Sequence, residues 1–157
     1  GEGDGHQTPL RATLLAVIER EGPLDATLRI ADNLLKHGAR PDLPDAEGRS
    51  LLHGLLGAGL SEPLSRDENR IGAAVRLLAS HQANLNALDR DLRTALHWAC
   101  RHAFVSLAGL LLELGADPTL PDAERKLPVD LLTPRTRIHL GPLLRQAAEA
   151  WQRQRGK

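Results

Sequence analysis

Apolar residues recur along this chain in short segments that have the spacing of helical faces. The clearest case begins with an expected short helix from Ala95 to about His102. After a break near Ala103, apolar residues return at spacings of three and four, at Leu107, Leu110, Leu111 and Leu114. This spacing predicts a second helix with one apolar face. Neither helix is long enough to be stable alone, so each needs a neighbouring element to cover its apolar face.

Polar residues and glycine mark where these two helices begin and end. The hydroxyl of Thr94 can accept a hydrogen bond from the first-turn N–H groups of the first helix. Gly115 can take the positive φ that ends the second helix, and Pro118 prevents the helix from resuming. The segment from Asp89 to Pro121 is therefore predicted to be a turn, a helix, a helix and a loop.

The same unit is repeated along the chain. A leucine pair followed by a small turn occurs three times, at Leu34-Leu35 with Gly38-Ala39, Leu77-Leu78 with Gln82-Ala83, and Leu111-Leu112 with Gly115-Ala116. Six residues after each copy stands an aspartate, so that Asp45, Asp89 and Asp122 lie 44 and 33 residues apart. Such periodicity predicts stacked helical units that bury their apolar faces against one another.

The cleanest unit resembles an ankyrin repeat. From Thr94 to Pro118 it reads TALHWACRHAFVSLAGLLLELGADP, which is similar to the TPLH start and LLLxxGA close of that family. Related starts stand at 48–53 and, in worn form, at 127–131; at the front, Thr8-Pro9-Leu10 competes with the register Thr13-Leu14-Leu15. The resemblance implies an all-α ankyrin-repeat solenoid of about four helix-turn-helix repeats with short β-turn fingers.

This register predicts how the chain is divided. Residues 1–7 are expected to be a disordered leader or a cloning remnant, and 154–157 a basic tail. Between them we expect a single ankyrin-repeat domain over 8–153, with repeats at about 8–44, 45–88, 89–121 and 122–153.

The first two units are longer than the repeat period. In the second unit the excess falls at about 60–68, where Ser65 and Glu68 have the spacing of a capping box that would restart the helix. The first unit carries a similar excess at about 19–25. Two long loops on one edge could form a secondary contact site, or could be surface loops tolerated because closure entropy rises slowly with length.

A final helix is expected to start at Gly141-Pro142. Its predicted inner stripe consists of Leu143, Leu144, Ala147, Ala148 and Trp151. Trp151 would seal the end of the core or, if exposed, contact a further domain. Basic residues on the outer face suit a terminal repeat, whose outer side must be polar.

Composition narrows the classes of partner. The 157 residues are 41% hydrophobic, which suits one domain with a sizeable core. Twenty basic residues balance twenty acidic ones, and aromatic residues make up 2%, so direct nucleic-acid or anionic-membrane binding is not expected. A single cysteine fits a reducing compartment, and with no apolar run of about 18 residues and no signal-like start we expect a protein of the cytoplasm or nucleus. On its own the chain is expected to be a monomer.

A cluster of two histidines and a cysteine, and a nearby tryptophan, each have both a functional and a structural interpretation. His97, Cys100 and His102 are zinc-ligand types, but on one helix His102 points away from His97, and no second cluster completes the site. The ankyrin resemblance instead implies that His97, like His53, is a structural histidine that bonds the adjoining turn. Trp98 is either a partner contact or, as we expect, a core residue packed opposite Gly54.

The turns that start each unit are the most informative candidates. Counted from the aspartate, position three is acidic and position five is basic in every copy: Glu47, Asp91 and Glu124, then Arg49, Arg93 and Lys126. Stacking predicts two parallel ladders of opposite charge, or alternatively local charge pairs of little energetic value. The resemblance implies that this concave edge contacts partners, together with two residues late in the first helix, which are Gly57 and Ala58 in the second unit and Arg101 and His102 in the third.

These observations predict a protein-binding adaptor without catalytic activity, cofactor or metal. No nucleophile with a paired base and no phosphate loop occurs in the sequence. Arg90, Arg93, Arg101 and His102 make the third repeat basic, so the expected partner is an acidic protein segment, and His102 would make binding pH-sensitive if it contacts a carboxylate. Two alternatives stay open: an inhibitor that occludes a kinase or transcription factor, and the targeting module of a larger enzyme.

Overall fold

The structure is a computed structural model that describes residues 8–19, 23–42, 44–45, 47–57 and 67–155. Within these ranges all regular secondary structure is helical. The elements in chain order are α1 (Pro9–Glu19), α2 (Leu24–Lys36), α3 (Leu51–Leu55), α4 (Glu68–Ser80), α5 (Ala95–Arg101), α6 (Val105–Glu113), the 3-10 helix η2 (Pro128–Leu131) and α7 (Pro134–Arg155).

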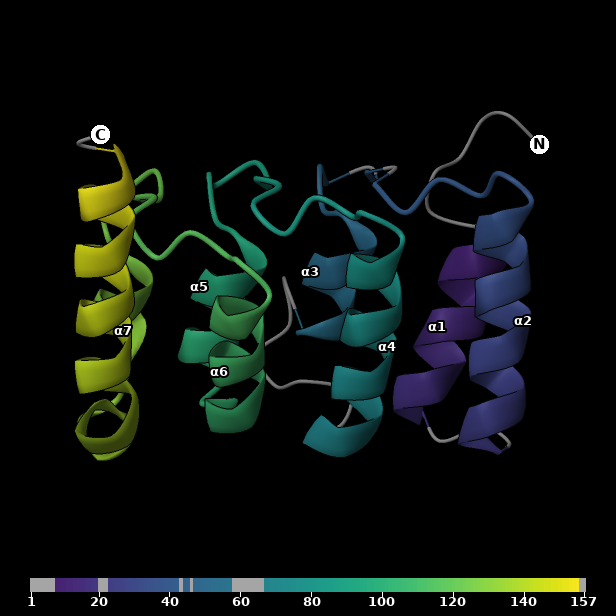
Figure 1. The fold of residues 1–157 in the computed structure, drawn as a ribbon, viewed down its shortest axis with the longest axis horizontal. Coiled ribbons are helices and arrows are strands. Elements are labelled where there is room, and N and C mark those ends of the chain that lie inside the picture. The colour runs from purple at the N-terminus through teal and green to yellow at the C-terminus, as the bar shows by residue number, and fades with distance from the viewer. Residues whose placement is uncertain (1–7, 20–22, 43, 46, 58–66, 156–157) are drawn as a thin grey trace.

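The helices form pairs that stand side by side in one row (Figure 1). In this view α2, α4, α6 and α7 lie in front, α1, α3 and α5 lie behind, and the connections between successive pairs run along the top. The first pair, α1 and α2, and the last helix, α7, lie at opposite ends of the row. Each second helix packs on its neighbours, since α4 contacts α2 and α6, and α6 contacts α7. The predicted all-α solenoid is confirmed.

The predicted start and stop signals act as expected in the third unit. Thr94 is the N-cap of α5, and its side chain accepts the backbone N–H of His97 at 3.4 Å. After α6 the chain turns through Gly115 at φ 102°, and the N–H of Ala116 bonds the carbonyl of Leu111 at 2.9 Å. Gln82 occupies the same place after α4 at φ 64°, a conformation that strains a side chain bearing a Cβ. At the front, Thr8 accepts the N–H of Arg11, which settles the register in favour of Thr8 over Thr13.

The core runs through the whole stack. Buried leucines lie in every pair of helices, with Leu14 in α1, Leu52 in α3, Leu96 in α5 and Leu144 in α7 all at most 2% exposed. The repeated leucine pairs supply part of this core, through Leu35, Leu78 and Leu111. Each short helix is therefore stabilised by burial against its neighbours rather than by its own length.

One side chain from each of the first three units also bonds the turn of the next unit. Arg11 donates through Nη2 to the carbonyl of Arg49 at 3.4 Å. His53 and His97 hold equivalent places, and their Nε2 atoms lie 2.7 Å and 3.0 Å from the carbonyl oxygens of Arg93 and Lys126. Both histidines accept a backbone N–H at Nδ1, so Nε2 carries the proton that is donated. The prediction of structural histidines is confirmed.

A second set of contacts joins the loops that follow the second helices. Asp42 accepts the backbone N–H of Asn84 at 2.9 Å, and Asn86 accepts that of Asp117 at 2.8 Å. The carboxylate of Asp117 then pairs with Arg155 near the end of α7 at 2.8 Å. Each interface between units is thus held by polar contacts on the loops as well as by the apolar core.

The structure corrects the predicted loop of the first unit. The helix α1 extends to Glu19 and α2 begins at Leu24, with 20–22 outside the described residues. These helices have 11 and 13 residues, against 7 and 9 in α5 and α6, so the excess lengthens helices instead of forming a long loop. The prediction of two adjacent long loops is therefore wrong.

In the second unit the insertion lies between α3 and α4, as predicted, although 58–66 are outside the described residues. The predicted capping box is wrong, because α4 begins at Glu68 and its N-cap is Asp67, which accepts the N–H of Arg70 at 3.2 Å. Ser65 itself lies outside the described residues. Glu68 instead reaches the next unit, where it accepts the N–H of Leu107 in the first turn of α6 at 3.2 Å.

The last helix also differs from its prediction. It begins at Pro134, not at Gly141-Pro142, and Pro142 lies inside it. Thr133 supplies the cap, accepting the N–H of Thr136 at 3.3 Å, and Pro134 suits the first position, so the start signal was already complete upstream. Within the helix Pro142 lacks only one backbone donor. Leu144 is buried as predicted, whereas Leu143 is 42% exposed and does not belong to the inner stripe.

Candidate functional site

Three turns of identical construction line the edge of the solenoid where successive units connect. We name them finger two (45–49), finger three (89–93) and finger four (122–126). In each, the aspartate accepts the backbone N–H groups of positions three and five through one oxygen, at 2.8–2.9 Å. The backbone N–H of the same aspartate bonds the carbonyl of position five, at 2.9–3.1 Å. The starting aspartates Asp45, Asp89 and Asp122 are therefore structural.

These contacts lower the pKa of two of the aspartates, Asp45 and Asp122. Burial acts to raise the pKa of Asp122, but the N–H groups of Lys126 and Glu124 and the side chain of Arg93 hold this pKa below its usual value. The pKa of Asp45 is also lowered: burial opposes the shift, whereas the N–H groups of Arg49 and Glu47 favour it. Fingers two and four are thus held by ionised carboxylates.

Position four of every finger takes a left-handed conformation. Gly48 has φ 73°, Leu92 has φ 57° and Arg125 has φ 63°. Glycine adopts this conformation without strain, whereas leucine and arginine do so at a cost of about 1–2 kcal/mol each. Finger two therefore carries the expected turn residue, and fingers three and four do not.

The predicted charge ladders resolve into ion pairs within and between fingers. Arg49 pairs with Asp45 at 3.5 Å, and Lys126 pairs with Glu124 at 3.3 Å. Between fingers two and three, Arg90 pairs with Glu47 at 3.6 Å, and both of these side chains are exposed. The alternative of local charge pairs describes these contacts, although some of them join neighbouring fingers.

Arg93 connects finger three to finger four. Its Nε lies 3.4 Å from the buried carboxylate of Asp122, and its Nη2 lies 3.9 Å from Glu124. The guanidinium also lies 5.2 Å from the centre of the Trp98 ring. Its side chain is 13% exposed. Arg93 thus links two repeats, and little of its side chain is accessible to a partner.

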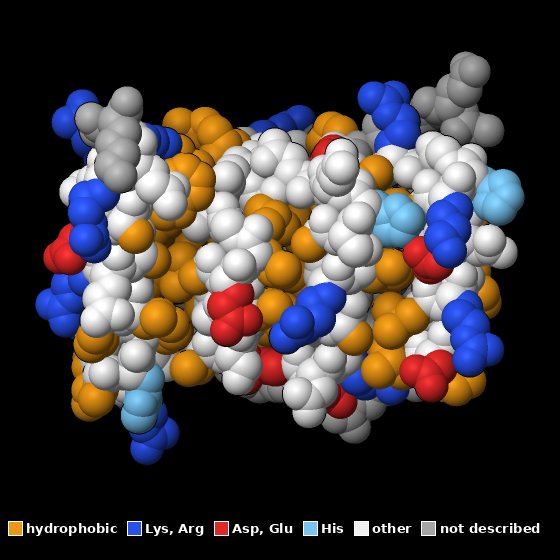
Figure 2. All heavy atoms as spheres, viewed as in Figure 1, with side chains coloured by type: hydrophobic (Ala, Val, Ile, Leu, Met, Phe, Trp, Pro, Cys, Tyr) orange, Lys and Arg blue, Asp and Glu red, His pale blue; other side chains and the backbone are white. Residues whose placement is uncertain are grey.

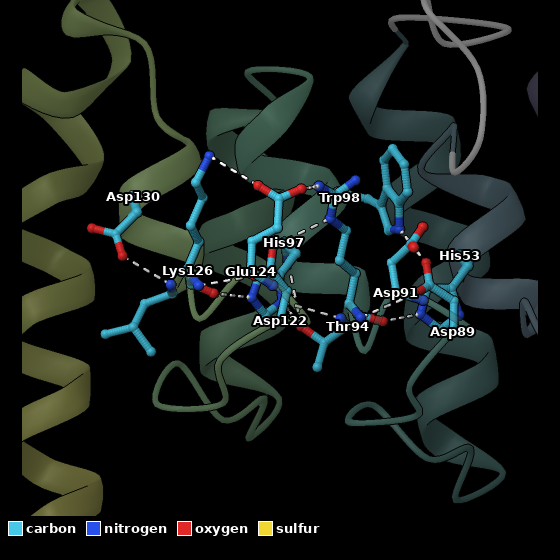
Figure 3. A network of polar contacts seen from close by, with 12 residues as sticks. His53, Asp89, Asp91, Thr94, His97, Trp98, Asp122, Glu124, Lys126 and Asp130 are labelled. Carbon is cyan, nitrogen blue, oxygen red and sulfur yellow. Dashed lines mark hydrogen bonds and ion pairs between the residues drawn. The ribbon is translucent and has the colours of Figure 1, made fainter.

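Trp98 does not pack against Gly54, so that prediction is wrong. A Cβ placed on Gly54 would meet Arg11 and Leu15 of α1, because this face of α3 points toward the preceding unit. Trp98 points back toward finger three instead, and its Nε1 donates to Oδ2 of Asp89 at 2.9 Å (Figure 3). A hollow of about 250 Å³ lies beside it, lined by Glu47, Arg49, Asp89, Arg90, Asp91 and Trp98. The tryptophan is a structural residue, as expected, but with a different partner.

The two residues late in α5 have different surroundings. Arg101 is exposed, with its guanidinium 5.8 Å from the centre of the Trp98 ring. His102 is only 7% exposed; its Nε2 lies 3.1 Å from the carbonyl oxygen of Gly57, and its ring stacks on Trp98. The structure therefore does not support His102 as a partner contact, nor the pH sensitivity expected from it. In the second unit Gly57 is described and Ala58 is not.

The alternative zinc site is not built. His97 bonds the N–H of Thr94 and the carbonyl of Lys126, so both ring nitrogens are engaged within the protein. Cys100 is buried, and this burial raises the pKa of its thiol to about 12. Among the described residues no group of three or more His, Cys, Asp or Glu side chains could hold a metal ion.

Sequence reasoning missed two exposed leucines, one directly before finger three and one on it. Leu88, directly before the finger, and Leu92, at its fourth position, are each 46% exposed. The signal was present in the sequence, because Leu92 stands where finger two has Gly48. The candidate surface therefore consists of Glu47, Arg90, Asp91, Leu88, Leu92, Arg101, Glu124 and Lys126.

The face formed by α2, α4 and α6 is different in character. Figure 2 shows charged side chains scattered singly over these helices, with hydrophobic side chains in the grooves between them. No large patch of one charge gathers on this face. In the part of the chain that the structure describes, none of the helices has the length and apolar character needed to cross a membrane.

Comparison with known proteins agrees with the repeated geometry. The family described as "Ankyrin repeats (3 copies)" matches residues 15–122. The Caenorhabditis elegans ankyrin repeat and LEM domain-containing protein 1 homolog is 53% identical over 49 residues, which are 31% of this chain and 7% of that protein. Human Rabankyrin-5 is 36% identical over 100 residues, 63% of this chain and 8% of that protein.

A third relative is human Palmitoyltransferase ZDHHC13, which is 39% identical over 82 residues, 52% of this chain and 11% of that protein. The chain thus corresponds to a small part of the length of each of these relatives. The helix pairs, the fingers and the family match lead to the same conclusion. This chain belongs to the ankyrin-repeat family.

Proposed function

We propose that this chain is an adaptor module that binds an acidic segment of a partner protein along its fingers. Ankyrin repeats are protein-interaction modules, and this membership supports the general class of function. The specific surface rests on one observation: the fingers are fixed by contacts made by Asp45, Asp89 and Asp122, while other side chains on them face solvent. A rigid support with variable exposed side chains suits recognition of another protein.

The basic character of the third repeat favours an acidic partner. Arg90 and Arg101 are exposed, whereas Arg93 is held by Asp122 and Glu124. Arg90 and Arg101 are therefore the residues proposed to attract the acidic partner. Arg93 contributes indirectly, by holding fingers three and four together. Carboxylates of the partner would compete with Glu47 for Arg90. Breaking the Arg90–Glu47 pair costs little free energy, because exposed ion pairs contribute little to stability.

Affinity capture with a charge-reversed variant tests this proposal. The chain would be compared with Arg90→Glu/Arg101→Glu and with a control, Arg29→Glu/Arg137→Glu, which reverses the same number of charges on exposed residues of α2 and α7. We expect partners captured by the native chain and the control to be lost from the finger variant. Equal capture by all three proteins would contradict the proposal.

A module of a larger enzyme is a second candidate, favoured by one comparison. Two relatives are palmitoyltransferases, ZDHHC13 and AKR1, in which the matched segment makes up 11% and 13% of the protein. The finger surface would then hold a substrate or regulator for a catalytic domain elsewhere in the parent protein. The complete coding sequence decides between these roles. No comparable observation favours the kinase or transcription-factor inhibitor, and a cytoplasmic or nuclear location is also a proposal.

A further inference from the structure

Finger three presents a leucine in a conformation that leucine disfavours. Leu92 has φ 57°, in the left-handed region where a Cβ meets the following carbonyl. Strain of this kind is normally compensated when the side chain packs into a core. Leu92 is instead 46% exposed, so the fold gains little from its side chain. The backbone conformation costs stability, and the exposed part of the side chain contributes nothing to offset that cost.

The rest of finger three is built to hold this conformation. The carboxylate of Asp89 binds the N–H groups of Asp91 and Arg93 at 2.9 Å and the indole of Trp98. The N–H of Leu92 bonds the carbonyl of Asp89 at 3.0 Å. On the other side, the carbonyl of Asp91 accepts the N–H of Ala123 from finger four at 2.9 Å. Leu92 therefore lies on a turn whose backbone is fixed by hydrogen bonds to Asp89 and to finger four.

The surroundings of Leu92 combine apolar and basic groups. Leu88, four residues earlier, is exposed to the same extent. Arg90 lies on the same finger with 69% of its side chain exposed. Arg101 is exposed at the end of α5, with its guanidinium 5.8 Å from the centre of the Trp98 ring. Arginine is enriched at the energetic centres of protein interfaces, and an exposed apolar side chain beside it would be removed from water on binding.

We infer that Leu92 is a pre-positioned apolar anchor which inserts between hydrophobic side chains of an acidic amphipathic segment, whose carboxylates contact Arg90 and Arg101. This inference rests on the proposed function and gives the partner a definite chemistry. The strain carried by the free protein is part of the mechanism, because the leucine is already in place when the partner arrives. Leu88 extends the same apolar contact.

A displayed library of random peptides, selected against the full chain, provides the probe. A recovered peptide is then titrated against the native chain, Leu92→Gly, Arg101→Glu and the control Ile138→Ser, which removes an apolar side chain 75% exposed on α7. The change to glycine keeps the left-handed turn and relieves its strain, so loss of folding cannot explain loss of binding. Thermal unfolding of each variant checks this point.

We expect recovered peptides to combine apolar and acidic residues, and their binding to weaken at least about tenfold in Leu92→Gly and in Arg101→Glu but not in Ile138→Ser. If Arg101→Glu weakens binding and Leu92→Gly does not, the anchor is refuted while the proposed function stands. If neither Leu92→Gly nor Arg101→Glu changes binding, the proposed function fails as well. If Leu92 instead mediates a dimer of this chain, seen as a loss of dimer in Leu92→Gly by light scattering, the inference is also overturned.

Discussion

The indole N–H of Trp98 donates to Oδ2 of Asp89, with 2.9 Å between the two heavy atoms. This contact links the first helix of the third unit to the start of its own finger. The other oxygen of Asp89 organises the finger backbone, so one carboxylate fixes both the turn and its position on α5. Finger three is held through a side chain that the repeat pattern alone would assign to the apolar core.

Replacing Trp98 by phenylalanine tests this link. The ring is retained but the donor is lost, so the buried oxygen of Asp89 loses a partner, and unfolding in urea should require about 1–2 kcal/mol less free energy. Trp151→Phe is the matched control, since that ring is only partly buried and lies beside Arg155. A larger loss in Trp151→Phe than in Trp98→Phe would contradict the assigned role.

Arg93 and Arg90 are predicted to respond differently to the same change. Arg93→Glu places a second negative charge against the buried Asp122, and we expect a loss of about 2–4 kcal/mol in unfolding free energy. Arg90→Glu changes an exposed side chain and should stay within about 0.5 kcal/mol of the native protein. Chemical denaturation measures both. Equal effects would show that Arg93 is an ordinary surface residue.

The left-handed turn after α4 is a site for stabilisation. Gln82 has φ 64°, where Gly115 has φ 102° in the next unit. Gln82→Gly should stabilise the protein by roughly 0.5–1 kcal/mol. This gain is the strain that glycine relieves in the folded state, reduced by the extra conformational entropy that glycine gives the unfolded chain. Gly115→Ala is the converse test: its Cβ would meet nothing within 4 Å, so the expected loss of about 1 kcal/mol comes from the backbone alone. Thermal melts showing the opposite order would refute this account.

The buried histidines make stability depend on pH. Burial lowers the pKa of His53 and of His97 below the usual 6.5, so the folded state binds fewer protons than the unfolded state. Their contribution is fully present above the unfolded pKa of about 6.5 and is lost progressively as pH falls below that value. Protonation would place a hydrogen on Nδ1 of each ring. That hydrogen would face the backbone N–H of Ser50 or Thr94, which now donates to Nδ1, so the hydrogen bond would be lost.

The free energy of unfolding should therefore decrease between about pH 7 and pH 5. His53→Gln/His97→Gln lowers stability at pH 7 but should flatten this dependence, whereas the exposed His139→Gln should leave it unchanged. Urea denaturation at a series of pH values provides the measurement. A dependence that persists unchanged in the double variant would assign it to other groups.

The repeat pattern predicted most of the fold, because the leucine pairs, caps and turn glycines are local signals that recur in register. Thr94 and Gly115 act as their residue types suggest. Predictions failed where two signals competed. Thr133-Pro134 starts the last helix before Gly141-Pro142 is reached, and the extra residues of the first unit extend α1 and α2 because helical bonds continue through them.

The candidate surface was less predictable, because it depends on contacts between units. The charge of Arg93 suggested a partner contact, but its position beside Asp122 and Trp98 makes it a support. His102 is polar and late in α5, yet it is buried under the neighbouring loop at Gly57. Leu92 was overlooked although its alignment with Gly48 marks the position as one that favours glycine, and its φ of 57° shows this directly. The partner-binding role of the remaining charged residues stays a prediction.

Hydrogen–deuterium exchange of the chain with and without a bound partner tests the central claim most directly. If the fingers form the binding surface, added protection should concentrate at 88–93 and at the end of α5, around Arg101. The helices α2, α4 and α6 should exchange as in the free protein. Protection confined to those three helices, with finger three unchanged, would place the partner on the opposite face and contradict the account.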